Sequence, residues 1–135
     1  MALDPSLELR QEVVTLLRAT DALTDIVGER GYGEQPSDAL PERPFWRYGV
    51  DDVVPSEDSC GIGAVIEFPI HSFSVAKFTD EVRQMNSAAA TALHDAVIDL
   101  DDGLKARLQW LRSTIQRDAA DPKAWHGIAR FRATI

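Results

Sequence analysis

The sequence lacks the features that define several large classes of protein. Its single cysteine, Cys60, cannot form an internal disulfide or a cysteine-based zinc site, and it suggests a reducing compartment. No stretch approaches the roughly 20 apolar residues that cross a bilayer. The first residues, Met1–Pro5, contain neither the basic nor the apolar segment of a secretion signal. We therefore expect a protein of the cytoplasm that does not enter a membrane.

Low-complexity tracts are also missing. Hydrophobic residues make up 44% and charged residues 27% of the 135 residues, which is typical of a folded protein rather than of a disordered segment. A chain of this length can bury a sufficient core without disulfides or a metal ion. The composition predicts one folded domain, residues 1–135.

Positive charge is scarce and unevenly distributed. The net charge of −8 disfavours binding to nucleic acid or to anionic lipid. Residues 1–103 carry 7 basic and 20 acidic side chains, a net of −13, whereas residues 104–135 carry 7 basic and 2 acidic ones, a net of +5. Such a division can steer the basic surface of one copy onto the acidic surface of another.

Apolar residues at helical spacing predict three helices. The first covers about Pro5 to Thr20, and a short second one begins at Asp21 and ends before Gly28, which is a natural helix stop. The third is long, covers about Thr79 to Ile98 and has Thr79 as its N-cap. We expect this third helix to lie on a sheet.

The remaining apolar segments predict strands. Phe45–Val50 and Gly63–Val75 should pair as a hairpin around an acidic, mobile loop at residues 51–62, with a bulge or free edge at Pro69. Two further strands, and a short one around Tyr32, complete the expectation of an α+β fold. It consists of a mainly antiparallel sheet of about four strands packed against one long and one or two N-terminal helices. The two further strands are expected at Leu104–Asp118 and from Trp125 to Ile135.

The segment Leu104–Asp118 has an irregular pattern for a strand. Leu108 and Trp110 lie on one face, and Leu111 and Ile115 lie on the other. This pattern predicts either a bulge or burial on both sides.

No group of residues has the spacing of a catalytic or cofactor site. The pairs Gly31/Gly33 and Gly61/Gly63 lack the third glycine or the following lysine of a phosphate-binding loop. Cys60 lies in a polar segment without a neighbouring base and is interpreted as a free surface thiol. We expect no enzymatic activity and no cofactor.

The sequence also predicts no metal site. The aspartates before Gly103 resemble a calcium loop but have the wrong register, so Asp99–Gly103 is interpreted as a turn. The histidines His71, His94 and His126 are far apart in the sequence, and we expect polar-face positions rather than metal ligation.

The three tryptophans leave one nucleic-acid hypothesis open. Trp46, Trp110 and Trp125 lie on or beside expected strands, where arginines could interleave with them to bind single-stranded nucleic acid. Aromatic residues on strands belong more often to a core or a protein interface, and the chain is acidic. Binding of single-stranded nucleic acid is therefore the less favoured alternative function.

Several short strings follow one another in a set order along almost the whole chain. They are Asp21-Ala22-Leu23, Ile26-Val27-Gly28, Leu40-Pro41, Pro44-Phe45, the strand end near Phe73, Leu93-His94 and the terminal segment from His126 to Arg132. In their order and spacing they resemble the phage tail completion or tail terminator family, including its members in gene transfer agents. None of these strings is a catalytic signature.

The resemblance implies a structural function. It implies a ring, expected to be hexameric, at the head-proximal end of the tail tube, where the ring stops tube polymerisation and joins the tail to the neck. The implied partners are further copies of the chain, the tail tube protein and the neck or stopper protein, while DNA passes through the lumen without specific binding. A neck stopper or another minor tail protein is the nearest alternative. The expected location is the tail–neck junction of an assembled phage or gene-transfer-agent particle, after assembly in the bacterial cytoplasm.

A ring requires contacts in which one surface of a copy meets a different surface of the next copy. The division of charge suggests which residues form these surfaces. We expect a basic surface and an acidic one, built respectively from Arg112, Arg117, Arg130 and Arg132, and from Asp51, Asp52, Glu57 and Asp58.

Overall fold

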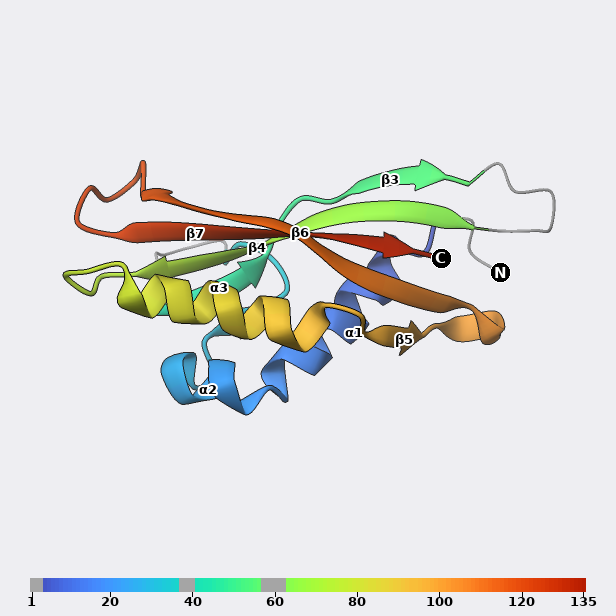
Figure 1. The fold of residues 1–135 in the computed structure, drawn as a ribbon, viewed down its shortest axis with the longest axis horizontal. Coiled ribbons are helices and arrows are strands. Elements are labelled where there is room, and N and C mark those ends of the chain that lie inside the picture. The colour runs from blue at the N-terminus through green and yellow to red at the C-terminus, as the bar shows by residue number, and fades with distance from the viewer. Residues whose placement is uncertain (1–3, 37–40, 57–62) are drawn as a thin grey trace.

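A computed structural model describes residues 4–36, 41–56 and 63–135 of the chain. Its helices are α1 (Ser6–Arg18), α2 (Asp21–Val27) and α3 (Asp80–Leu93). They lie on one side of a long sheet (Figure 1). Helix α3 runs along strands β4, β6 and β7, and helix α2 lies against α3. The fold is α+β, as the sequence predicts.

The sheet has seven strands in the described part of the chain. Its order is β1-β2-β4-β7-β6-β5, and β3 pairs with β4 beside β2. All pairs are antiparallel except β1 with β2. The strands are β1 (Gly31–Tyr32), β2 (Phe45–Tyr48), β3 (Asp52–Pro55), β4 (Ala64–Ser74), β5 (Val97–Asp99), β6 (Lys105–Arg117) and β7 (Trp125–Thr134).

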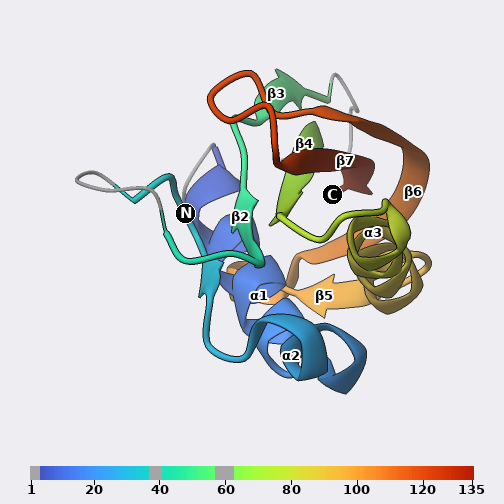
Figure 2. The same ribbon diagram turned by 90° about the vertical axis from the view of Figure 1, so that its left-hand side faces the viewer.

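The sheet curls around the helices, so that its end strands β1 and β5 both contact α1 (Figure 2). We call the side that faces the helices the inner face and the opposite side the outer face. Alternating residues point to the two faces of a strand, which explains the burial pattern. Inward-facing Ile66, Phe68 and Phe131 are fully or almost fully buried against Leu9 and Val13 of α1.

The helices α1 and α2 confirm the sequence-based prediction closely. Gly28 follows α2 with a φ of 60°, which is the left-handed conformation that glycine adopts without strain. The prediction for α3 is wrong at its C-terminal end, because the helix stops at Leu93 rather than near Ile98. The chain reverses at Asp95, with a φ of 63°, and the β-branched residues Val97 and Ile98 then pair with β6 as strand β5.

The prediction of about four strands is too low, and α1, at 13 residues, is almost as long as α3, at 14. The missed strands are short. Part of the expected loop 51–62 is strand β3, because Val53 and Val54 pair with Ile66 and Val65. The rest of that expected loop, residues 57–62, lies outside the described residues.

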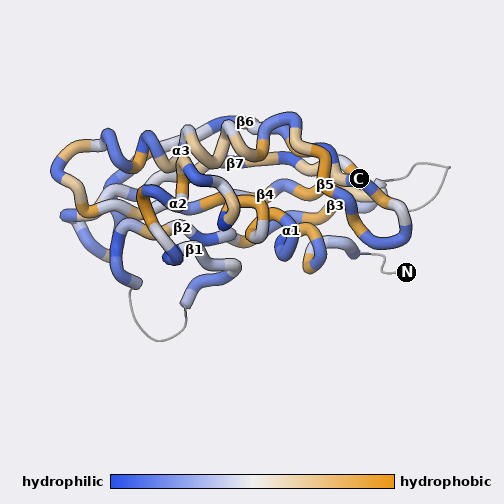
Figure 3. The backbone as a smooth tube through the Cα atoms, turned by 90° about the horizontal axis from the view of Figure 1, so that it is seen from below, coloured by the Kyte–Doolittle hydropathy of each residue, from blue (hydrophilic) through white to orange (hydrophobic). Residues whose placement is uncertain are grey.

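Two irregularities expected from the sequence are present. Strands β2 and β3 are separated at Gly49–Asp51, next to Pro69 of β4, which cannot donate a backbone hydrogen bond. A β-bulge interrupts β6 between Trp110 and Arg112. The turn Asp99–Gly103 leads from β5 into β6, and the loop next to β5 is mostly hydrophilic (Figure 3).

Candidate interaction surfaces

Three of the four predicted interface arginines lie together on the outer face. Arg112 of β6 stands directly opposite Arg130 of β7, and Arg132 follows two residues further along β7. Arg112 and Arg130 are exposed. The guanidinium of Arg132 donates a hydrogen bond of 3.0 Å to Oε1 of Glu67, which belongs to the neighbouring strand β4. We call Arg112, Arg130 and Arg132 the outer arginine cluster.

The outer arginine cluster is an unfavourable arrangement for an isolated sheet. Like charges directly opposite each other on neighbouring strands repel and reduce stability. Arg112 and Arg130 form such a pair, and Pro69 on the other side of Arg130 supplies no carboxylate. An acidic surface docked on the outer face would convert this repulsion into attraction.

The fourth predicted arginine belongs to the other side of the sheet. Arg117 stands opposite Trp125, and its guanidinium carbon lies 3.7 Å from the centroid of the indole ring. This cation–π contact orients Arg117 at the end of β6 and separates it from the outer arginine cluster. Alternation beyond the bulge places Arg117 on the opposite face from Arg112, and the bulge at Trp110–Arg112 sets Arg112 opposite Arg130 on the outer face.

Two of the predicted acidic interface residues belong to the segment between β2 and β4. Asp51 accepts a hydrogen bond of 3.1 Å from the hydroxyl of Tyr48, and burial together with Asp51 raises the pKa of that hydroxyl. Asp52 opens strand β3 opposite Glu67 and lines a shallow outer-face pocket together with Arg132. The other two predicted residues, Glu57 and Asp58, lie outside the described residues.

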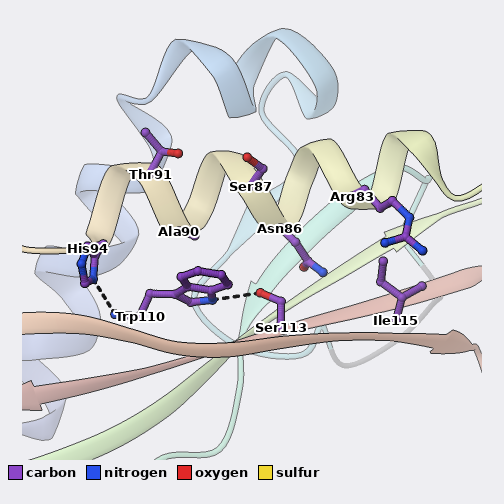
Figure 4. A pocket seen from close by; sticks show the side chains of 9 residues that line it. All are labelled: Arg83, Asn86, Ser87, Ala90, Thr91, His94, Trp110, Ser113 and Ile115. Carbon is purple, nitrogen blue, oxygen red and sulfur yellow. Dashed lines mark hydrogen bonds between the residues drawn. The ribbon is translucent and has the colours of Figure 1, made fainter.

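A groove between α3 and β6 is a concave feature of the described chain. It has a cavity volume of about 600 Å³. Figure 4 shows Trp110 between helix and strand, with its indole N–H donating to the Ser113 hydroxyl at 3.0 Å. The backbone N–H of Trp110 donates to His94 Nδ1 at 3.1 Å. The lining residues include no carboxylate; they are Arg83, Asn86, Ser87, Ala90, Thr91, His94, Trp110, Ser113 and Ile115.

The groove exists because α3 lies closer to β7 than to the end of β6. A Cβ atom on Gly127 of β7 would come within 2.7 Å of Asn86 Oδ1 and 2.8 Å of Val82 Cγ2. Glycine therefore permits the close approach of the helix. At the bulge of β6, Trp110 is 44% and Leu111 40% exposed.

The edge of β6 beside the groove is unpaired over most of its length. Strand β5 pairs only with Lys105–Arg107, and backbone bonds from Asp95 and to Ala96 extend the contact to Leu108. From Gln109 to Arg117, no strand in the described part of the chain covers this edge. An exposed strand edge offers N–H and C=O groups to another chain. The sequence predicted either a bulge or burial on both sides for this strand, and the structure has the bulge; the free edge was not predicted.

The structure brings together two histidines that are far apart in the sequence. His71 Nδ1 lies 2.7 Å from His126 Nε2, and the ring of His126 stacks on Phe73 at 4.4 Å between centroids. Burial, followed by the positive charges of Arg47, His126 and Arg130, lowers the pKa of His71 to about 3. Burial also lowers the pKa of His126. Both rings are therefore neutral near pH 7 and share a hydrogen bond.

The described residues do not form the tryptophan platform that a single-strand-binding module would need. Trp46 is 1% exposed and belongs to the core, while Trp125 lies under Arg117. Within residues 4–36, 41–56 and 63–135, no group of three or more histidine, cysteine, aspartate or glutamate side chains is placed to hold a metal ion. The same residues contain no helix that is long and apolar enough to span a bilayer.

Comparison with known proteins supports a structural function in a virus-like tail. The family described as "Tail completion protein gp17" matches residues 11–135. A chain of the solved structure described as "Virion of native gene transfer agent (GTA) particle" is similar, with a TM-score of 0.81 and 28% sequence identity over 93% of this chain and 92% of that chain. No curated protein matches. The resemblance read from the sequence is confirmed, and the chain belongs to the tail completion protein gp17 family of phage-type tail structural proteins.

Proposed function

We propose that copies of this chain form a hexameric ring at the head-proximal end of the tail tube of a phage or gene-transfer-agent particle. The ring stops polymerisation of the tube protein and joins the tail to the neck. The observation that carries this proposal is the match of nearly the whole chain to a subunit of a gene-transfer-agent virion, together with membership of the tail completion family. The chain performs this function by assembly and without catalysis.

The charge distribution supports self-assembly. In a ring, each copy presents two different surfaces to its neighbours. The outer arginine cluster and Arg117 belong to the basic segment 104–135, and Asp51 and Asp52 belong to the acidic remainder of the chain. We propose that these basic and acidic residues meet between copies or between the ring and the tube protein, with Glu57 and Asp58 on the acidic side.

The same excess of carboxylates suits a channel for DNA. A chain of net charge −8 repels phosphate, so DNA passes through the lumen of the proposed ring without specific binding. The outer arginine cluster then faces a protein rather than the lumen, because three guanidinium groups lining the channel would retain the DNA backbone.

Polymerisation of the purified tail tube protein tests the proposal. With this chain present, tubes should be short and should carry a ring at one end in negative-stain images, and native mass spectrometry should show a hexamer. The double variant Arg112→Glu/Arg130→Glu should weaken capping, whereas Lys123→Glu, an exposed charge change on the β6–β7 turn, should not. Tubes of unchanged length without end rings would refute the terminator function.

A neck stopper is the alternative that this experiment separates. A stopper would bind a tube that is already terminated and would leave the length of growing tubes unchanged. The two proteins therefore differ in tube length, even though both can form rings.

A further inference from the structure

We propose that the free edge of β6, from Gln109 to Arg117, binds the β3 strand (Asp52–Pro55) of a second copy, with the α3–β6 groove receiving its side chains. This inference rests on the proposed ring and specifies how neighbouring copies contact each other. The sheet of one copy would continue into the sheet of the next copy through antiparallel strand pairing.

The edge of β6 has the properties of a strand-docking site. No strand of the described chain covers its nine residues, and only the N–H of Trp110 is already bonded, to His94. The edge lies beside a cavity of about 600 Å³ and exposes the large apolar side chains of Trp110 and Leu111. An added strand brings backbone N–H groups and apolar side chains to such an edge.

Strand β3 has the complementary properties. Within the described chain it pairs only with β4, so its second edge is also free. The segment from Val50 to Pro55 contains two carboxylates and no basic residue, and Val50 and Val54 are 91% and 54% exposed. Against this acidic strand, the docking site carries basic residues and a carboxylate-free groove. These basic residues are Arg83, Arg112 and Arg117.

The two edges lie on opposite sides of the sheet, as a head-to-tail contact requires. Strands β3, β4, β7 and β6 follow one another across the sheet, so the free edge of β3 and the free edge of β6 face in opposite directions, although β5 covers the part of β6 that is level with Val53–Pro55. Each pairing step is antiparallel, which makes β3 antiparallel to β6. Rotation about a ring axis preserves direction along that axis, and β3 of the next copy would therefore meet β6 as an antiparallel neighbour.

The register across the sheet predicts that neighbouring copies are shifted relative to each other along the strand direction. Asp52 is level with Glu67, Arg132 and Gln109 across the sheet, whereas Val53–Pro55 are level with the part of β6 that β5 covers. Docking along Gln109–Arg117 consequently requires a shift along the strands between neighbouring copies. Such a shift accompanies the strand tilt of every closed barrel.

Cysteine cross-linking in the full chain tests the pairing. In a Cys60→Ser background, Val54→Cys is combined in turn with Leu111→Cys, Ser113→Cys or Gln116→Cys, because the register along β6 is open. Rings assembled on tail tubes are then mildly oxidised. At least one pair should give a ladder of disulfide-linked multimers, since the Cα atoms of paired strands lie within the disulfide range of about 4.4 to 6.8 Å. Val54→Cys with Lys123→Cys is the matched control and should give no ladder.

The outcomes separate the inference from the proposed function. Rings that cap tubes but give no ladder with any of the three β6 positions would overturn the strand docking and leave the terminator function standing. A chain that remains monomeric in the presence of tubes would overturn both. A ladder with the Lys123→Cys control equal to that with the β6 positions would also overturn the docking, because it would show unspecific collision.

Discussion

The two halves of β6 belong to one strand but have opposite surroundings. In the first half, Lys105–Leu108, the strand is bonded to β5 and the residues before it, and from Arg107 onward also to β7, and Ala106 and Leu108 are fully buried. In the second half, Gln109–Arg117, it is paired only with β7 and exposes Trp110 and Leu111. The change occurs next to the bulge at Trp110–Arg112. One strand can therefore serve the core with one half and present an edge to other molecules with the other half.

The largest expected effect is in the buried half. Leu108→Ala should lower the free energy of unfolding by about 2–5 kcal/mol, because Leu108 is 0% exposed and its removal leaves a cavity. The matched change Leu111→Ala, in the exposed half, should cost less than about 1 kcal/mol. Urea unfolding of both variants measures the difference, and equal losses would contradict the division of β6 into two halves.

A smaller loss is expected where α3 approaches β7. Gly127→Ala should lower the free energy of unfolding by about 1–3 kcal/mol, because the added methyl group would overlap Asn86 and Val82. Gly103→Ala is the contrasting change, since no atom lies within 4 Å of its added methyl group and its loss comes from its φ of 75°. A crystal structure of Gly127→Ala should show α3 displaced and the groove widened. An unchanged helix position with unchanged stability would contradict the tight contact.

Acidic pH should lower the free energy of unfolding through the histidine pair His71 and His126. His71 has a pKa of about 3 when folded and about 6.5 when unfolded. Below pH 6.5 the unfolded chain takes up a proton that folded His71 does not, so stability is complete above pH 6.5 and decreases as the pH falls toward 3. The slope should be at most about 1 kcal/mol per pH unit, after allowance for partial exposure.

His71→Gln removes the titrating group and provides the comparison. Its urea midpoint should change less between pH 7 and pH 5 than that of the parent protein. An identical pH dependence in both proteins would show that folded His71 does not stay neutral at acidic pH.

The smallest expected effect on the free energy of unfolding is an increase rather than a decrease. Arg112→Glu should raise the free energy of unfolding by about 0.2–1 kcal/mol, because it replaces the repulsion between Arg112 and Arg130 with an attraction across the strands. The same variant should cap tail tubes less well, since it places a negative charge in the outer arginine cluster. Denaturation midpoints at low and high salt measure the first effect. A loss of stability would contradict the repulsion between the two guanidinium groups.

The sequence predicts the regular parts of this fold because their patterns are local. Helix α1 and the alternation of Ala129, Phe131 and Ala133 in β7 depend on spacing alone, and both are confirmed. The sequence did not predict the short strands β3 and β5, which have four and three residues. Segments this short form strands only because they pair with a long neighbour, β4 or β6. Their formation depends on tertiary pairing.

The candidate surfaces were predictable only in part. Charge distribution along the chain indicated the arginines, but the bulge in β6 decides that Arg112, and not Arg117, shares the outer face with Arg130. The groove depends on Gly127 and Asn86 meeting across two elements, and the histidine pair depends on β4 and β7 being neighbours. Such contacts between distant segments have no signature in a single sequence.

Amide hydrogen exchange of β6 is the most direct test of the assembly edge. In the free protein, the amides of Lys105–Leu108 should exchange slowly, and those of Gln109–Arg117 that point away from β7 should exchange fast, apart from Trp110, which donates to His94. On capped tail tubes, the fast amides should slow by about tenfold or more, which corresponds to roughly 1.4 kcal/mol of protection. Capped tubes on which these amides still exchange as fast as in the free protein would contradict the account.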